Sequence, residues 1–209
     1  MMGKLEEAIN DLTKALELKP RSCLTLNARG SAYVQLKKYD QAIHDYTEAL
    51  RLEPNRENTY INRAYVYQCQ RECEKAISDL NKALELNPKN WQAFDMRGTT
   101  YVQLKKFGEA IRDYSEALHL EPKRADTYID RAIAYREERE YEKAIDDLTE
   151  AIRLAPANGT AYLQRGKIYR AKKILEKAEK DLEQAKRLGA KDHCHEEELG
   201  RHLNLGASK

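Results

Sequence analysis

Small and apolar residues recur along this chain at spacings of three and four, which places them on one face of an α-helix. Residues 23–56 contain two such stripes, separated by the short polar segment 36–40. The first stripe holds Leu26, Gly30 and Tyr33, and the second holds Ala42, Tyr46 and Ala49. Because so short a connection joins antiparallel neighbours, this pattern predicts a hairpin of two helices.

The same pattern repeats with a period of 34 residues. All five prolines lie on that spacing, and each stands where the second helix of a unit must end, because proline cannot continue a helix. They are Pro20, Pro54, Pro88, Pro122 and Pro156. A second-helix alanine follows the same period, at Ala42, Ala76, Ala110, Ala144 and Ala178. This period is typical of a tandem array of helical hairpins, whose core runs continuously between neighbouring units.

The chain therefore divides into an array over residues 1–192 and a polar tail over residues 193–209. Residues 1–22 carry the second half of one repeat. Five further repeats follow at 23–56, 57–90, 91–124, 125–158 and 159–192, so that we expect eleven repeat helices. The last repeat is expected to act as a cap, because Glu179 and Lys186 stand where earlier repeats carry isoleucine or leucine.

The repeating positions of residues 1–192 resemble the tetratricopeptide repeat (TPR). Its series of large aromatic, small, tyrosine, alanine, aromatic, alanine and proline is met by Phe94, Gly98, Tyr101, Ala110, Tyr114, Ala117 and Pro122. The departures are mild, since Leu26 replaces the first aromatic and Cys73 replaces the equivalent of Tyr39. The resemblance implies an all-α fold, a right-handed superhelical solenoid of antiparallel helix pairs. In that family the first helices line a concave groove, commonly a protein- or peptide-binding surface.

Charge and composition exclude some classes of protein. Charged residues make up 34% of the chain, yet 37 Lys and Arg against 35 Asp and Glu leave a net charge of only +2. Such a balance argues against a nucleic-acid-binding protein, which carries a basic excess on one face. No apolar run approaches the roughly 18 residues of a membrane span, no signal peptide begins the chain, and the four cysteines form no disulfide framework. We therefore expect a soluble, cytoplasmic protein that binds neither nucleic acid nor membrane.

No group of residues in the sequence supports catalysis. The chain has no glycine-rich phosphate loop, no nucleophile motif and no zinc-ligand spacing, so we expect a protein that is not an enzyme and holds no cofactor or metal. Residues 193–195 (His-Cys-His) are of metal-ligand types, but adjacent side chains on a helix point apart and the segment belongs to the tail. Cys69 and Cys73 lie four residues apart, but Cys73 takes a core position, and we interpret it as a buried structural thiol.

An arginine recurs at one position of every first helix, and an aspartate recurs sixteen residues later on the second helix. The pairs are Arg29 with Asp45, Arg63 with Asp79, Arg97 with Asp113, Arg131 with Asp147 and Arg165 with Asp181. A surface that reads one ligand varies from repeat to repeat, whereas a packing device does not. We therefore interpret these residues as Arg–carboxylate pairs that bridge helices, and keep a basic ladder for an anionic ligand as the alternative.

The family resemblance places the variable positions of the first helices on the concave side of the array, where specificity is expected. Tyr65 is the one tyrosine of thirteen that does not occupy a repeat-packing position. It lies beside Asn62, and a ring next to an amide suits peptide binding; the alternative is a tyrosine lying flat on its own helix. The residues expected in this groove are Asn27, Asn58, Asn62, Tyr65, Gln68, Gln92, Asp95, Asp126, Asp130, Arg136 and Lys167.

These observations predict a non-catalytic protein–protein interaction scaffold that binds a peptide or protein segment in its groove. The alternative is an architectural or self-associating segment of a longer repeat array. It rests on the apolar face of the N-terminal half repeat, which no preceding helix of the sequence covers. That face is formed by Leu5, Ile9, Leu12 and Leu16.

Overall fold

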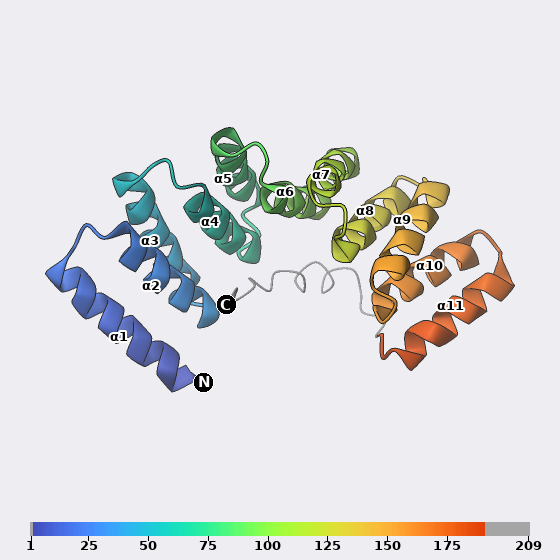
Figure 1. The fold of residues 1–209 in the computed structure, drawn as a ribbon, viewed down its shortest axis with the longest axis horizontal. Coiled ribbons are helices and arrows are strands. Elements are labelled where there is room, and N and C mark those ends of the chain that lie inside the picture. Colours follow the sequence, from blue (N-terminus) through green and yellow to red (C-terminus); the bar gives the residue numbers. More distant parts are fainter. Residues whose placement is uncertain (1, 191–209) are drawn as a thin grey trace. The chain divides into compact units, whose positions relative to one another are not determined.

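The computed structural model describes residues 2–190, and within them it contains eleven α-helices and no strand (Figure 1). The helices are α1 (Met2–Leu18), α2 (Cys23–Gln35), α3 (Tyr39–Leu52), α4 (Glu57–Cys69), α5 (Cys73–Leu86), α6 (Trp91–Gln103), α7 (Phe107–Leu120), α8 (Ala125–Glu137), α9 (Tyr141–Leu154), α10 (Gly159–Ala171) and α11 (Leu175–Arg187). The all-α prediction is confirmed, and every first helix begins at the predicted start of its repeat. The predicted polar tail, residues 193–209, lies outside the described residues.

The helices form two compact units that divide after Thr100, within α6. In the first unit α2 pairs with α3 and α4 with α5, while α1 packs on α2 and α3 on α4. In the second unit α8 pairs with α9 and α10 with α11, while α7 packs on α8 and α9 on α10. Each unit is therefore a stack of antiparallel helical hairpins in which every hairpin covers an apolar face of the next.

Small residues allow the two helices of a hairpin to approach closely. Ala42, Ala76, Ala110 and Ala144 are fully buried. At Gly30 an added Cβ would lie 2.8 Å from Cε1 of Tyr46, so the ring occupies the space that any larger residue would need. Large rings and small residues on facing helices therefore fill one layer between them, as close-packed interiors require.

The turn inside each hairpin is held by a basic residue in the left-handed backbone region. These residues are Lys37, Arg71, Lys105, Arg139 and Lys173, with φ between 56° and 61°. At the first of these turns the Lys38 N–H donates to the Tyr33 carbonyl and the Lys37 N–H donates to the Val34 carbonyl, both at 2.9 Å. This is the Schellman arrangement, which satisfies carbonyl groups at the end of the first helix. A cation there also suits the negative end of the helix dipole.

Four of the five predicted Arg–Asp pairs are confirmed, and each is bidentate. In the first unit, Nε and Nη2 of Arg63 donate to Oδ2 and Oδ1 of Asp79, both at 2.8 Å. The same two bonds join Arg29 to Asp45, Arg131 to Asp147 and Arg165 to Asp181, at 2.7–3.0 Å. The hydrogen bond to Asp79 raises the pKa of Arg63, so the charged form is favoured. The pairs fasten the first helix of a repeat to its second helix.

The remaining guanidinium nitrogen of each arginine reaches the preceding repeat. Nη1 of Arg63 donates to Thr47 Oγ1 on α3 at 2.9 Å, sixteen residues earlier. The equivalent acceptors are Thr13, Asn81, Ser115 and Thr149, for Arg29, Arg97, Arg131 and Arg165. The Arg63 guanidinium carbon also lies 5.9 Å from the ring centroids of Tyr60 and Tyr67. The Arg63 side chain thus joins its own helix, α4, to α3 and α5. This supports the interpretation of the recurring arginines as structural residues rather than as a binding site for an anionic ligand.

The apolar residues of the N-terminal helix are buried to different degrees. Ile9 and Leu16 are buried, and Leu16 belongs to a cluster with Cys23, Leu26 and Ala49. Leu5 and Leu12 are half-buried, and α1 packs on α2. On α11, Glu179 and Lys186 are exposed.

Replacing Arg63 or Asp79 with alanine should lower the unfolding free energy by about 2–4 kcal/mol each, because the remaining charge stays largely buried without its partner. The double variant should lose about 1–3 kcal/mol less than the sum of the two single losses. Urea unfolding followed by circular dichroism measures all three. The control is Arg51→Ala, which breaks an exposed pair with Glu48 and should cost at most about 1 kcal/mol. Strict additivity of the two single losses would contradict the pairing.

Ala110→Glu should destabilise the protein by about 3 kcal/mol, because the longer charged side chain enters the fully buried contact with Val102, Tyr114 and Ala134. Ala8 occupies the same repeat position on α1 but is exposed. Ala8→Glu should therefore leave the thermal unfolding midpoint almost unchanged. Equal effects of the two substitutions would show that burial does not distinguish these alanines.

Lys105→Val should lower the unfolding free energy by roughly 1 kcal/mol, because a β-branched residue tolerates positive φ poorly. Lys105→Gly removes the same charge without that conformational cost and should be neutral or stabilising. Urea unfolding of both variants separates the two contributions. A loss of equal size in the glycine variant would assign the effect to the charge rather than to the backbone.

Candidate functional site

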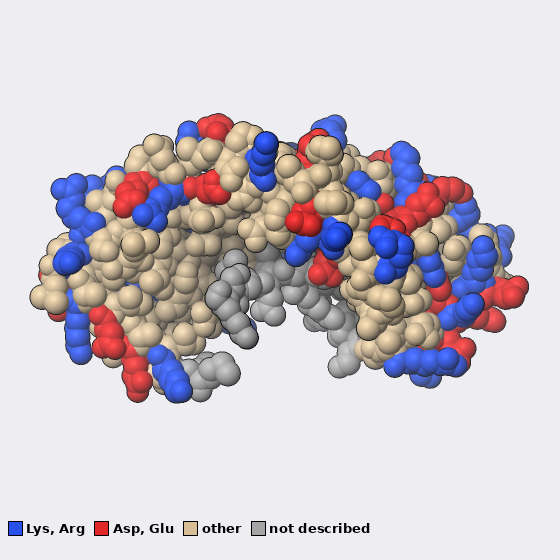
Figure 2. Space-filling model, viewed as in Figure 1, with Lys and Arg blue, Asp and Glu red and all other residues tan. Residues whose placement is uncertain are grey.

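The side chains exposed on α2 and α4 are mainly neutral and polar. Figure 2 shows a broad uncharged area over these two helices, with charged side chains gathered toward the edges. The charged residues of the two helices are Arg29, Glu57 and Arg63, and the two arginines are held in the Arg–Asp pairs described above. Glu57 accepts hydrogen bonds from the side chains of Asn87 and Asn90. Apart from this carboxylate, the face offers mainly amides and hydroxyls.

A polar hollow of about 340 Å³ opens on this face, at the start of α4. We call it the asparagine hollow. It is lined by Asn27, Asn55, Arg56, Glu57, Asn58, Thr59 and Asn62. Four carboxamides, from α2, from α4 and from the turn between α3 and α4, thus surround one space. Asn27, Asn58 and Asn62 were expected in the groove. Asn55 was not, because it lies in the turn after Pro54 and not on a first helix.

The four carboxamides are not equally available. Asn27 donates to the Cys23 carbonyl at 2.9 Å and accepts a hydrogen bond from Thr59 Oγ1 at 2.9 Å, so it holds α2 against α4. The side chains of Asn55, Asn58 and Asn62 make no hydrogen bond to any of residues 2–190. Each therefore presents an unused donor and acceptor to solvent at the hollow.

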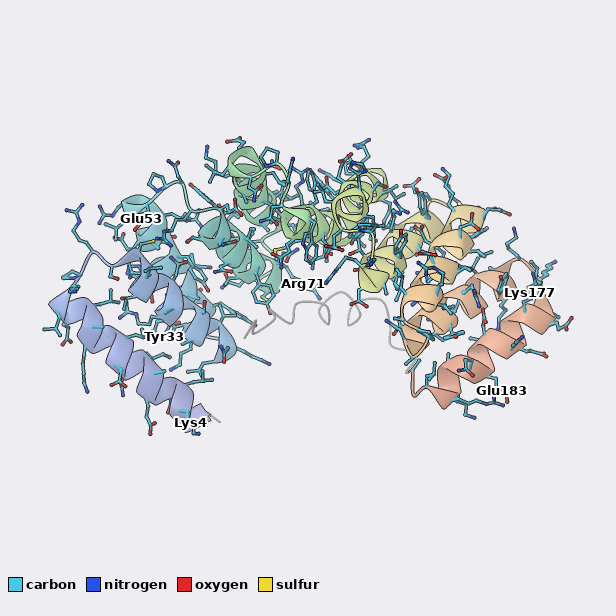
Figure 3. The ribbon with its side chains drawn as sticks, viewed as in Figure 1. Lys4, Tyr33, Glu53, Arg71, Lys177 and Glu183 are labelled. Carbon is cyan, nitrogen blue, oxygen red and sulfur yellow. The ribbon has the colours of Figure 1, made fainter. Side chains whose placement is uncertain are left out.

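A second hollow, of about 520 Å³, lies beside the first at the turn between α1 and α2. We call it the leucine hollow. Its lining includes Lys19, Pro20, Arg21, Leu24, Glu53 and Arg56, so Arg56 borders both spaces. Glu53, labelled in Figure 3 at the end of α3, accepts a hydrogen bond from Arg56 and thereby raises the pKa of that guanidinium.

Two of the predicted groove residues belong to the packing. Gln68 is only 3% exposed and its amide donates to the Met96 carbonyl at 2.9 Å and to Thr100 Oγ1 at 2.6 Å, so it joins α4 to α6. Tyr65 is half-buried against Tyr46 and its cluster, and burial together with the neighbouring Cys69 raises the pKa of its hydroxyl. Gln68 is thus used in the contact with the next first helix, and Tyr65 in the contact with the preceding hairpin.

The predicted site residues of the second unit form a different set. Asp130 is buried, and Asp126 accepts a hydrogen bond from Asn158 at 3.3 Å. Arg136 donates to Gln164 at 2.5 Å, and Lys167 is half-buried on α10. In the first unit, Gln92 is exposed and Asp95 is half-buried on α6. Neither Gln92 nor Asp95 lines the hollow that holds Asn58 and Asn62.

The groups that could support chemistry are few in the described part of the chain. Residues 2–190 contain no cluster of three or more metal-ligating side chains. Burial raises the pKa of the Cys23 and Cys73 thiols, which disfavours the nucleophilic thiolate. None of the described helices is long and apolar enough to cross a membrane. The arrangement is thus suited to binding through neutral hydrogen bonds.

Solved structures of similar fold include MamA, at 24% identity and a TM-score of 0.73 over 77% of this chain and 94% of that chain. PilF of Pseudomonas aeruginosa has 23% identity and a TM-score of 0.77, over 89% and 85% of the two chains. YrrB, described as a TPR protein with an unusual peptide-binding site, has 22% identity and a TM-score of 0.71, over 87% and 93%. At these identities the likeness shows the fold alone. No curated protein sequence matches the chain significantly.

Family models described as the tetratricopeptide repeat match most of the chain. The matched residues are 2–22, 24–56 and three overlapping stretches at 61–126, 96–156 and 129–193. They agree with the helical hairpins of both units and with the period of 34 residues. The chain belongs to the tetratricopeptide repeat family, whose members serve as protein-interaction scaffolds.

Proposed function

We propose that this protein is a non-catalytic scaffold that binds an extended segment of a partner protein on the face formed by α2 and α4. One observation carries the proposal. Three carboxamides with unused hydrogen-bonding capacity, those of Asn55, Asn58 and Asn62, surround one hollow on a face that carries few charged side chains. No reaction and no cofactor are part of this function.

An extended peptide suits this arrangement because of its own hydrogen-bonding groups. A peptide group carries one N–H donor and one carbonyl acceptor, and an asparagine side chain offers the complementary pair. In a helix or sheet these backbone groups are already used, whereas an extended segment leaves them free. The hollow therefore favours a ligand that is recognised by its backbone.

The helices that carry the carboxamides are held rigidly. Asn58 and Asn62 lie on α4, which Arg63 fastens to both α3 and α5. Asn27 and Thr59 fix the spacing between α2 and α4 through their hydrogen bond. Binding to such a surface does not need to order the scaffold, so little free energy is lost on that account.

The double variant Asn58→Ala with Asn62→Ala should weaken binding of a twelve-residue peptide, selected from a random displayed library, at least tenfold. Each lost amide leaves one peptide group of the ligand unpaired, and two such losses of about 1 kcal/mol each suffice. Fluorescence anisotropy of the labelled peptide measures the affinity. Helical content and the thermal midpoint should stay unchanged, because neither side chain bonds to any of residues 2–190.

The matched control is Asn10→Ala with Gln41→Ala, which removes two exposed carboxamides from α1 and α3. It should bind the peptide like the unaltered chain. Equal affinity of the control and the Asn58 and Asn62 variant would place the peptide elsewhere on the molecule. The charged set of the second unit, around Asp126, Arg136 and Lys167, would then be the next surface to alter.

A further inference from the structure

We propose that the leucine hollow binds the acidic and aliphatic side chains of the same segment whose backbone the asparagine hollow holds. The ligand is then an extended peptide in which a glutamate or aspartate stands next to a leucine or isoleucine, followed by uncharged residues. This inference rests on the proposed function, because it assigns side-chain chemistry to the ligand proposed there.

The apolar component comes from residues 18–24. Leu24 is 66% exposed and Leu18 is 85% exposed, and they are two of the four large apolar side chains that stand out from residues 2–190. A single exposed leucine is ordinary. Here Leu24 and Pro20 line the hollow itself, and Leu18 is exposed just before the hollow's first lining residue, Lys19. Exposed apolar side chains gathered in this way are typical of a contact site.

The charge component comes from the rim of the same hollow. Lys19 and Arg21 are exposed and form no ion pair with any described residue, while Arg56 is paired with Glu53. Three cations and one carboxylate therefore line the hollow. A carboxylate of the ligand would pair with one of the two unpaired cations. It would accept a charge-assisted hydrogen bond from Lys19 or a bidentate pair of hydrogen bonds from Arg21.

The two hollows lie in sequence along one path. Arg56 lines both, so a chain leaving the leucine hollow passes this residue and meets Asn58 and Asn62. An extended segment of six residues reaches about 20 Å, enough for two neighbouring hollows. The apolar and acidic side chains would lie at the α1–α2 turn, and the peptide groups that follow would lie at the start of α4.

Other ligand chemistries use only part of this surface. A small free anion would leave Leu24 without a contact. An uncharged apolar segment would leave Lys19 and Arg21 without partners, and a basic segment would be repelled by them. An acidic–aliphatic segment contacts all three.

The test uses the whole chain labelled with ¹⁵N, because the side-chain NH₂ groups of asparagine give their own resonances. The probe is the blocked peptide acetyl-Gly-Ser-Glu-Leu-Ser-Gly-Ser-Gly-amide. One matched peptide carries lysine in place of the glutamate, and another carries serine in place of the leucine. We expect the first peptide to shift the side-chain signals of Asn58 and Asn62 and the backbone signals of residues 19–24. Its dissociation constant should be at least tenfold lower than that of either matched peptide.

Two variants locate the effect. Leu24→Ser should remove the preference for leucine, and Lys19→Glu with Arg21→Glu should reverse the preference, so that the lysine peptide binds more tightly. These side chains are exposed, and well-dispersed spectra check that the variants fold. The charge-matched control is Lys4→Glu with Lys89→Glu, which alters two exposed lysines of the first unit and should keep the original preference.

The outcomes separate this inference from the function on which it rests. If all three peptides shift Asn58 and Asn62 with equal affinity, the side-chain assignment is overturned and backbone binding stands. If none of the peptides shifts these amides, both are overturned. If the signals of residues 18–24 shift with protein concentration alone, the leucine hollow is a contact between two copies of the chain, and the inference is again overturned.

Discussion

The two units depend on what we call the arginine bridge. It consists of the hydrogen bonds that Arg29, Arg63, Arg131 and Arg165 donate to an aspartate of their own hairpin and to a neutral acceptor of the preceding one. A helical hairpin of this size cannot bury its apolar face alone and needs its neighbour. Each arginine meets that need with one side chain, because it binds the aspartate of its own hairpin through two nitrogens and a neutral acceptor of the preceding hairpin through the third. The planar guanidinium has donors in three directions, which a lysine in the same place could not reproduce. The hydrophobic contacts supply stability, and the bridge sets the alignment of three helices.

This alignment explains why the proposed binding surface lies where it does. The arginines use their charge inside the stack, so the exposed parts of α2 and α4 are left with amides, hydroxyls and one leucine. Exposed charges lie elsewhere, on the second helices and at the turns that hold Lys19, Arg21 and the left-handed residues. The surface can then separate two tasks, recognition of a backbone on neutral helices and recognition of side chains at a charged turn.

The fold was predictable from the sequence to a large extent, because a repeated pattern reports the same local structure five times. The hairpins, the buried alanines and the Arg–Asp pairs all follow from residues at fixed spacing. The candidate site was predictable only in part. Gln68 and Tyr65 occupy positions that face outward on an isolated helix. In the stack, Gln68 bonds to the next first helix, and Tyr65 packs against the preceding hairpin. Asn55 and the residues around Leu24 belong to turns, whose side-chain directions no helical period specifies. Burial between repeats and the course of the turns are properties of the assembled stack.

The neutral acceptors of the bridge have a consequence for how such a chain changes length. Thr13, Thr47, Asn81, Ser115 and Thr149 differ in type but accept the same bond from the arginine sixteen residues later. Because these acceptors are neutral, exchanging one repeat for another at a junction would leave no charged group there without its partner. Each 34-residue unit of residues 23–192 carries an arginine and, sixteen residues later, an aspartate. Loss or duplication of a whole unit by recombination would therefore keep both partners of each pair within one unit.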